Sequence, residues 1–308
     1  MNSTRAPAFI HSAKSRLRIT PDWPQLPTHI KLFCVSAVAL DSRGFLYVAH
    51  RGNNPLLRFN PDGSFDKEIG ANIQRKTIGY NLMGAEPVPM DLRHWLHGLH
   101  IDPWDNLWVT DVGRHLVWRF DPVGNLTLTL GVDGVSGADS QHFYQPSHVW
   151  VTPAGDFFVA DGYGNSRVVK YSATGKYLLE WGCRGTAVGE FHTPHVITSD
   201  PEGRLYIGDR ENDRVQVFDQ SGQPLAEWPG LHSVDGLHYA PDGFIYGGAG
   251  LDNAILKLDT NGQLLEVWAE PGVLNYPHGI TVDAAGTIYV AETSGNRVLR
   301  VTREINYT

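Results

Sequence analysis

Residues 95–111 read Trp-Leu-His-Gly-Leu-His-Ile-Asp-Pro-Trp-Asp-Asn-Leu-Trp-Val-Thr-Asp. The stretch has a short apolar run, a turn rich in Pro, Asp and Asn, and a second apolar run that ends at an acidic residue. Apolar runs of this length, separated by turn residues, are typical of antiparallel β-strands. The stretch therefore predicts a hairpin with His97 at the start of its first strand.

The same unit recurs along the chain. Copies begin at residues 36, 97, 147, 195, 235 and 278, so they are spaced by about 40 to 60 residues. Most copies continue with a third and a fourth apolar run, such as residues 167–171 and 177–182. A repeat of this length with four strands is typical of a β-propeller blade, and the pattern resembles NHL-type repeats. The sequence predicts an all-β, six-bladed β-propeller.

Domain boundaries follow from the repeat. The last copy stops after its third strand, near Thr302, so residues 16–20 are expected to supply the missing outer strand and close the ring. We expect residues 1–15 to be a loose N-terminal lead-in and residues 16–308 to form a single propeller domain. Two long insertions, residues 70–96 and 131–144, are expected to connect one blade to the next and to offer binding groups or a lid.

The composition limits which binding partners and which cellular compartment we expect for this chain. The formal net charge of −8 argues against nucleic acid as a partner. Cys34 and Cys183 are far apart and in no metal-like spacing, which favours a reducing compartment. No apolar run resembles a signal peptide or reaches the length of a membrane span. We expect a cytoplasmic monomer with no nucleic-acid or membrane partner.

A propeller places the first strand of every blade around one axis, so equivalent positions in these strands form a ring. At the opening position the six copies carry Ser36, His97, Ser147, His195, Asp235 and His278. Histidine thus occupies alternate blades. Three converging imidazoles suit a catalytic Zn²⁺ or another divalent transition metal, with a position open for water or substrate. The alternative, polar residues lining a wet channel, does not explain the alternation.

A second ring comes from the loops that follow the second strands. In the first, third and fourth copies these loops carry Arg51, Tyr163 and Arg210. Two guanidinium groups suit a carboxylate, because each offers paired donors in a fixed fork. A tyrosine near a cationic, metal-bearing centre can have its pKa lowered enough to act as a base. The alternative is that each arginine pairs with a neighbouring acid, such as Asp209, Glu211 or Asp161.

Four segments carry a resemblance to a known enzyme family. They are residues 97–112, residues 277–280, and the two most specific ones, Asp161-Gly-Tyr-Gly-Asn-Ser-Arg167 and Asp209-Arg-Glu-Asn-Asp-Arg214. These segments resemble signature segments of peptidyl-α-hydroxyglycine α-amidating lyase, a six-bladed propeller that completes peptide amidation. The likeness runs from about residue 30 to residue 302.

The resemblance implies the roles of the ring residues. It implies a zinc held by His97, His195 and His278. It implies a catalytic set of Arg51, Arg210 and Tyr163, in which both arginines also bind the substrate. Tyr276 stands where the family has a methionine, and we expect it to contact the substrate as well.

Three departures from the family pattern limit what carries over. Gly279 stands where the family has an aspartate that helps hold a structural calcium, so the resemblance does not carry the calcium site over to this chain. Gly164 replaces a cysteine, so the secretory disulfides are missing. No monooxygenase domain is present in the sequence. The expected substrate is a peptide or, without the peptide-hormone context, a smaller N-acyl-α-hydroxyglycine or a hemiaminal such as ureidoglycolate.

The predicted function is a metal-dependent carbon–nitrogen lyase that cleaves an N-acyl-α-hydroxyglycine-type carbinolamide to an amide and glyoxylate. Two alternatives stay open. One is a non-catalytic NHL-repeat module that binds a protein or peptide, but such a module needs no axial histidines facing two arginines. The other is a metal-dependent propeller hydrolase of the lactonase type. Calcium lactonases favour carboxylate and amide ligands, of which this ring has only Asp235.

Overall fold

The computed structural model describes residues 8–12, 14–70, 73, 79–81, 88–90 and 95–305 of the 308-residue chain. Strands and the turns between them make up almost all of these residues, with one short 3-10 turn, η2 (Arg210–Asn212). The predicted all-β class is confirmed. No helix in the described ranges is long and apolar enough to cross a membrane.

Four sheets contain four antiparallel strands each. The first has β3 (Val35–Leu40), β4 (Leu46–His50), β5 (Leu56–Phe59) and β6 (Phe65–Ile69). The second has β9 (Leu96–Ile101), β10 (Leu107–Asp111), β11 (Leu116–Phe120) and β12 (Leu126–Leu130). The third has β13 (His148–Val151), β14 (Phe157–Asp161), β15 (Arg167–Tyr171) and β16 (Tyr177–Trp181). The fourth has β17 (Pro194–Ser199), β18 (Leu205–Asp209), β19 (Arg214–Phe218) and β20 (Pro224–Pro229).

A fifth sheet contains nine strands in the order β21-β22-β23-β24-β1-β2-β27-β26-β25. Its first part is β21 (Val234–Tyr239), β22 (Ile245–Ala249), β23 (Ala254–Leu258) and β24 (Leu264–Ala269). Its second part is β1 (Ala8–His11), β2 (Ser15–Ile19), β27 (Arg297–Ile305), β26 (Ile288–Glu292) and β25 (Pro277–Val282). A separate two-stranded ribbon pairs β7 (Gly79–Asn81) with β8 (Val88–Met90).

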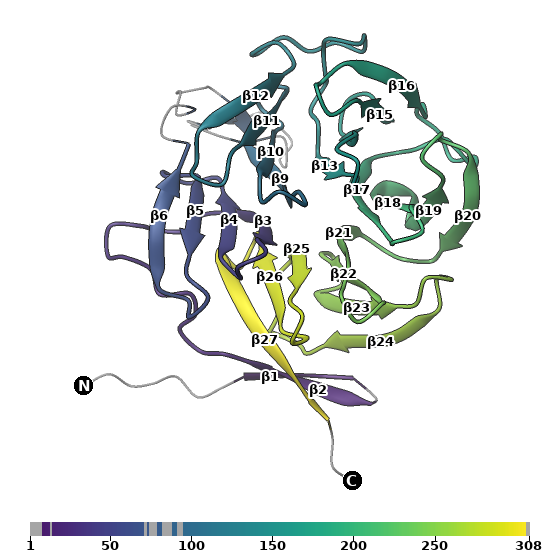
Figure 1. The fold of residues 1–308 in the computed structure, drawn as a ribbon. Coiled ribbons are helices and arrows are strands. Elements are labelled where there is room, and N and C mark those ends of the chain that lie inside the picture. The colour runs from purple at the N-terminus through teal and green to yellow at the C-terminus, as the bar shows by residue number, and fades with distance from the viewer. Residues whose placement is uncertain are drawn as a thin grey trace.

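The sheets are arranged as a propeller around a central axis (Figure 1). The inner strands β3, β9, β13, β17, β21 and β25 contact one another in chain order, and β25 contacts β3, so the ring is closed. Apolar side chains fill the wedges between neighbouring groups of strands. One cluster joins the first and second sheets around Tyr47 and Trp118, and another joins the two parts of the nine-stranded sheet around Trp268 and Val290. Burial of this apolar surface holds the sheets together.

The N-terminal strand closes the ring as the sequence predicts. Residues 15–19 form β2, which pairs with β27 along its whole length. Residues 8–11, placed in a loose lead-in by the sequence, instead form β1, which pairs with β2 and touches β24 at His11 and Ala269. This bridge merges what would be two sheets into one. Sheet pairing therefore gives a propeller without separating six individual blades.

Short turns join the inner strands to their neighbours. In the second sheet, Asp102 Oδ1 accepts the backbone N–H groups of Trp104 and Asn106. Asp102 Oδ2 accepts the indole N–H of buried Trp108 at 2.9 Å. An aspartate that bonds its own following backbone is a standard way to close a tight turn. These turns lie at the opposite end of the strands from the ring positions.

The two insertions connect an outer strand to the next inner strand, as predicted. The first, residues 70–96, lies mostly outside the described residues, and the expectation of binding groups there stays a prediction. The second, residues 131–144, is described and packs Phe143 into the core between the second and third sheets. Cys34 is partly buried, Cys183 is exposed, and both are free.

Candidate metal centre and active site

The ring residues are placed by bulges in the inner strands. In β17, Pro194 pairs with Asp209 and Val196 pairs with Gly208, so His195 is an extra residue without a partner. The registers of β3, β9, β21 and β25 shift at the same point, next to Ser36, His97, Asp235 and His278. A bulge turns the extra side chain away from the regular alternation of the strand. Here it directs these side chains toward the axis.

The three histidines predicted to converge do meet. Their ring centroids form a nearly equilateral triangle, with separations of 4.6 Å (His97–His195), 4.8 Å (His97–His278) and 4.9 Å (His195–His278). One ring nitrogen from each lies within 4.8 Å of those of the other two, and all three residues are buried. Metal binding by this cluster stays a prediction.

Hydrogen bonds fix the tautomer of each imidazole. Nδ1 of His97 lies 2.8 Å from the carbonyl oxygen of Ser147, Nδ1 of His195 lies 2.7 Å from that of Asp235, and Nδ1 of His278 lies 2.6 Å from that of Ser36. A carbonyl oxygen only accepts, so each Nδ1 carries the proton. Each Nε2 is then an unprotonated lone pair directed at the centre, which is the arrangement that a metal-ligating histidine has.

Burial keeps these imidazoles neutral. Loss of solvation lowers the pKa of His97 and His195 well below 6.5 and the pKa of His278 to about 3. The guanidinium group of Arg210 lowers the pKa of all three further, and that of Arg51 lowers the pKa of His97 and His278, since a nearby positive charge disfavours a second one. Neutral imidazole is the form that binds metals, so the site is ready for a metal at neutral pH.

Tyr163 lies directly against the cluster. Its hydroxyl oxygen is 2.9 Å from Nε2 of His97 and 2.9 Å from Nε2 of His195. One phenolic proton can serve only one of these two lone pairs, so the other faces an oxygen without a proton between them. A buried group of acceptors that lacks protons fits a cation at its centre. The donor set therefore suits a divalent transition metal.

The protein groups around Tyr163 raise its pKa above the usual value of a tyrosine. Burial is the largest influence and raises it, while the positive charges of Arg210 and Arg51 act in the opposite direction. The prediction of a lowered pKa concerns a metal-bearing centre and stays a prediction. Loss of solvation of the phenolate outweighs two guanidinium groups.

The two arginines have different partners. Arg210 donates to Glu211 at 2.7 and 2.9 Å, to Asp235 Oδ1 at 3.2 Å and to the Tyr163 hydroxyl at 3.2 Å, and it stacks on the tyrosine ring. Arg51 stacks on Trp95, and its buried Nε has no hydrogen-bond partner among the described residues. The alternative of pairing with acids thus applies to Arg210. Arg51 keeps donor capacity for a ligand.

The signature motifs build the loops that carry Tyr163 and Arg210. In the first motif, Asp161 Oδ2 accepts from Asn165 at 2.6 Å and from Arg167 at 3.0 Å. In the second, Asp209 Oδ2 accepts from Asn212 and from Arg214, both at 2.8 Å. Charge-assisted bonds of this kind are stronger than neutral ones. The conspicuous acids and arginines of these motifs position the loops, while Tyr163 and Arg210 point to the centre.

Tyr276 and the substituted glycines are also explained by their surroundings. Tyr276 has a left-handed backbone (φ +59°) immediately before β25, and burial raises its pKa to about 12. A Cβ at Gly164 would lie 2.2 Å from the ring of Tyr144, so the cysteine of the family does not fit there. A Cβ at Gly279 would lie 2.7 Å from Ala37 Cα. An aspartate at 279 therefore requires the neighbouring strand β3 to move.

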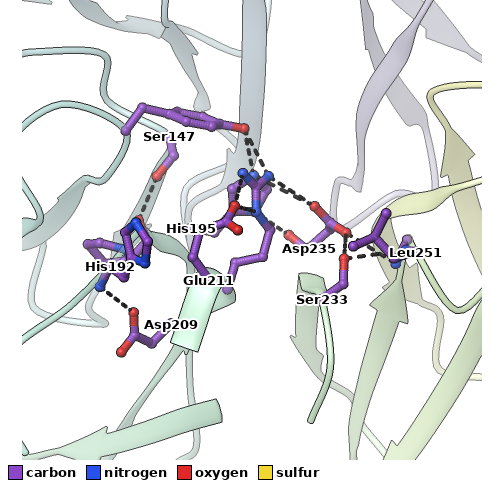
Figure 2. Close-up of polar contacts among 12 residues, drawn as sticks. Ser147, His192, His195, Asp209, Glu211, Ser233, Asp235 and Leu251 are labelled. Atoms are coloured by element: carbon purple, nitrogen blue, oxygen red, sulfur yellow. Dashed lines mark hydrogen bonds and ion pairs between the residues drawn. The ribbon is translucent and has the colours of Figure 1, made fainter. Parts of the chain in front are cut away.

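Two contributors were missed by the sequence reasoning. Asp235, noted only as a ring position, directs Oδ1 toward the cluster beside His195 and Glu211 (Figure 2). His50 is fully buried, and its Nδ1 accepts the backbone N–H groups of Phe33 and Gly52. Gly52 follows Arg51 in the chain, and the Phe33 carbonyl accepts the backbone N–H of Arg51. The signal for Asp235 was its place in the ring. His50 lies one residue before a ring position and gave no periodic signal.

A family model for the NHL repeat matches residues 191–218 and 274–300. Peptidyl-glycine α-amidating monooxygenase A of Xenopus laevis is 34% identical over 307 residues, covering 90% of this chain and 32% of that protein. Peptidyl-α-hydroxyglycine α-amidating lyase 1 of Drosophila melanogaster is 36% identical over 219 residues, covering 64% of this chain and 39% of that protein. The chain contains NHL repeats and is similar to the amidating lyases.

These relatives are longer than the NHL-repeat chain described here, which spans about a third of the length of the first curated relatives it matches. NHL repeat-containing protein 3 of Homo sapiens is 28% identical over 91% of this chain and 82% of that protein. Among solved structures, a streptogramin B lyase superposes with a TM-score of 0.63 at 16% identity, covering 96% of this chain and 88% of that chain. That likeness concerns the fold alone.

Proposed function

We propose that this chain is a metal-dependent lyase that cleaves the C–N bond of an N-acyl-α-hydroxyglycine and releases an amide and glyoxylate. The observation that carries the proposal is the convergence of three Nε2 lone pairs and the Tyr163 hydroxyl at one buried point, with two guanidinium groups beside it. The similarity to the amidating lyases supports the same chemistry.

We place this site in a six-bladed propeller. The nine-stranded sheet holds two sets of strands, each with its own inner strand, β21 and β25, and both inner strands belong to the ring. Taken as two blades joined edge to edge through β1, they bring the total to six. The histidines then lie in alternate blades, which accounts for the near-threefold triangle.

The reaction needs one proton to move from the substrate hydroxyl to the departing nitrogen. The O–H bond breaks, the carbon–oxygen double bond of glyoxylate forms, and the C–N bond breaks with its electron pair going to nitrogen. A metal held by His97, His195 and His278 would polarise the hydroxyl oxygen and lower the pKa of the hydroxyl. Tyr163, whose oxygen contacts two of these histidines, would act as the phenolate that a bound metal favours; it takes the proton at its phenolic oxygen and passes it to the departing nitrogen.

The arginines divide the remaining tasks. Arg51, with its buried Nε left without a partner, binds the substrate carboxylate. Arg210 donates to the Tyr163 oxygen at 3.2 Å and so favours its deprotonated form. Tyr276, beside Asp235 at the same end of the axis, contacts the substrate.

Metal content and product release test this function. Purified wild-type protein and the His195→Ala variant are compared by plasma mass spectrometry, and glyoxylate release from α-hydroxyhippurate is then measured. We expect about one transition metal per chain in the wild type, with loss of both metal and turnover in the variant. A wild-type protein that takes up no metal after incubation with zinc contradicts the proposal.

The same assay can identify the metal and the substrate class. We propose zinc as the metal and a small N-acyl-α-hydroxyglycine as the substrate, acted on by a cytoplasmic monomer. Incubation with Zn²⁺, Co²⁺, Fe²⁺ or Mn²⁺ before the assay ranks the metals, since imidazole sites bind several of them. Substrates of increasing acyl length rank the substrate class.

A further inference from the structure

Asp235 occupies the ring position of the fifth copy, and its carboxylate faces the histidine cluster. Its side chain is fully buried. Oδ1 lies 4.0 Å from Nε2 of His195 and 3.9 Å from Nε2 of His278. Among the described residues, the potential ligand atoms that all lie within 4.8 Å of one another belong to the three histidines alone, so Oδ1 lies close to two of the imidazoles and farther from that of His97.

The hydrogen bonds around the ring single Asp235 out. Each of the other five ring side chains donates to a backbone carbonyl at the start of the next inner strand. These bonds run from Ser36 to Leu96, from His97 to Ser147, from Ser147 to Pro194, from His195 to Asp235 and from His278 to Ser36. An ionised carboxylate has no proton to donate. Asp235 cannot join this chain of bonds, and its carboxylate only accepts hydrogen bonds.

One carboxylate oxygen is held in place and the other is directed inward. Oδ2 accepts from the hydroxyl of Ser233 at 3.0 Å and from the backbone N–H of Gly250 at 3.1 Å (Figure 2). A Cβ at Gly250 would lie 2.4 Å from this oxygen, so only glycine permits the approach. Oδ1 accepts from Arg210 at 3.2 Å. The two hydrogen bonds from Ser233 and Gly250 hold Oδ2, the oxygen farther from the histidines, and so fix the orientation of Oδ1, as expected for a preorganised metal ligand.

The charge balance of the site also favours a role for Asp235 beside the three imidazoles. Three neutral imidazoles bring no charge, and a buried dication without a counter-charge is costly. Asp235 supplies one negative charge within 4.0 Å of two of the imidazole nitrogens. Two ligands in a tetrahedral site with bonds of about 2.1 Å lie roughly 3.4 Å apart. A contraction of about half an ångström brings Oδ1 to that spacing from His195 and His278. Ligation also requires the carboxylate to move inward toward His97.

We infer that Asp235 Oδ1 is a fourth protein ligand, so that the metal site is a three-histidine, one-aspartate set. The inference rests on the metal site of the proposed function and deepens it. An N₃O set with a carboxylate suits Mn²⁺, Fe²⁺ and Co²⁺ as well as zinc. Coordination also draws Oδ1 away from Arg210 and frees one of its N–H groups for a substrate carboxylate. Metal loading and carboxylate binding are thereby coupled through one side chain.

Cobalt titration of the metal-free protein tests the inference without use of enzyme activity. The Asp235→Asn variant keeps the size and the acceptor oxygen of the side chain and removes its charge. We expect it to bind Co²⁺ about 10- to 100-fold more weakly than the wild type and to show an altered visible ligand-field spectrum. Glu211→Gln is the matched control, because it removes the other carboxylate on Arg210, and it should change neither.

The outcomes separate the two proposals. Equal Co²⁺ affinity and spectra in wild type and Asp235→Asn overturn the inference and leave the lyase proposal standing. Metal binding that depends on Asp235 in a protein that releases no glyoxylate supports the inference and overturns the lyase. A wild type that binds no Co²⁺ overturns both. If Asp235→Asn does not fold, a crystal structure of the cobalt-loaded wild type decides, with Oδ1 expected about 2.2 Å from the metal and an Oδ1 beyond about 3 Å contradicting it.

Discussion

The central channel carries three histidines at each of its two ends, and the two sets differ in which lone pairs are free. At one end, His97, His195 and His278 donate through Nδ1 to backbone carbonyls and leave Nε2 directed inward. At the other end, a cavity of about 220 Å³ is lined by His100, His148 and His238. There the ring nitrogens of His100 and His148 accept backbone N–H groups of the neighbouring inner strand, at 3.3 and 3.4 Å.

The difference shows that three histidines in a ring do not define a metal site. Both sets are neutral, since burial lowers the pKa of His100 to about 3 and those of His148 and His238 to about 4. Only the first set has its acceptor nitrogens close enough together to hold one ion. The bulges at the first end turn the side chains to the axis, whereas the second set lies in the regular part of the strands.

The largest expected contrast is between His195→Ala and His148→Ala. His195→Ala removes one of the three histidines of the proposed metal site and should abolish stoichiometric metal binding together with glyoxylate release. His148→Ala removes a partly exposed channel histidine and should retain about one metal per chain. Metal analysis of both purified variants checks this. Loss of metal in both, with the fold intact by circular dichroism, breaks the distinction between the two ends.

The next contrast concerns the two tyrosines near the channel. Tyr163→Phe should lower kcat about 10²- to 10⁴-fold with little change in KM, because it removes the proton acceptor and leaves the binding groups in place. Tyr239, which lines the cavity at the other end, serves as the control. Steady-state kinetics with α-hydroxyhippurate should show Tyr239→Phe close to wild type. Equal losses in kcat and in affinity for Tyr163→Phe would count against its role as base.

A smaller effect should separate the two arginines. Arg51→Lys keeps the charge and loses the fork, so KM should rise about 10-fold with kcat nearly kept. Arg210→Lys disturbs the hydrogen bond to Tyr163, so its main loss should be in kcat. The same kinetics measure both. If Arg51→Lys lowers kcat and leaves KM unchanged, the carboxylate is bound elsewhere.

The smallest effect concerns acid stability at the second end. The unfolded chain binds protons at histidine below about pH 6.5, and native His100 does so only near its lowered pKa of about 3. The free energy of unfolding should therefore fall as the pH drops below 6.5, by less than about 1.4 kcal/mol per pH unit per histidine, because each is partly exposed to the channel. His100→Gln should flatten this slope. Urea unfolding at pH 7.5, 5.5 and 4.5 measures it, and an unchanged slope contradicts the assignment.

The periodic features of this molecule could be predicted from its sequence. The repeat located the inner strands, and equivalence of position was enough to bring His97, His195 and His278 together. Tyr163 and Arg210 followed from the same equivalence in the next loops. These predictions succeeded because a repeated fold converts sequence position into spatial position.

The features that the sequence did not reveal are those that depend on local strand pairing or on the solvation of a side chain. The bridge from β1 to β24 rests on contacts between segments about 260 residues apart that show no periodicity. The raised pKa of Tyr163 depends on how completely the phenol is buried, which no spacing reveals. The inward turn of Asp235 depends on Ser233 and Gly250, two ordinary loop residues.

The strand β2 has a consequence for the order in which the molecule assembles. Its partner β27 lies about 280 residues away along the chain, so β2 has no partner strand in its sheet other than β1 until the last repeat has been synthesised. Repeats can form from local contacts as they emerge, but the circle closes only at the end. In refolding followed by pulsed hydrogen exchange, the amides of β2 should gain protection last. The histidine cluster would then be completed only with ring closure, since its third histidine, His278, lies in β25 of that final repeat.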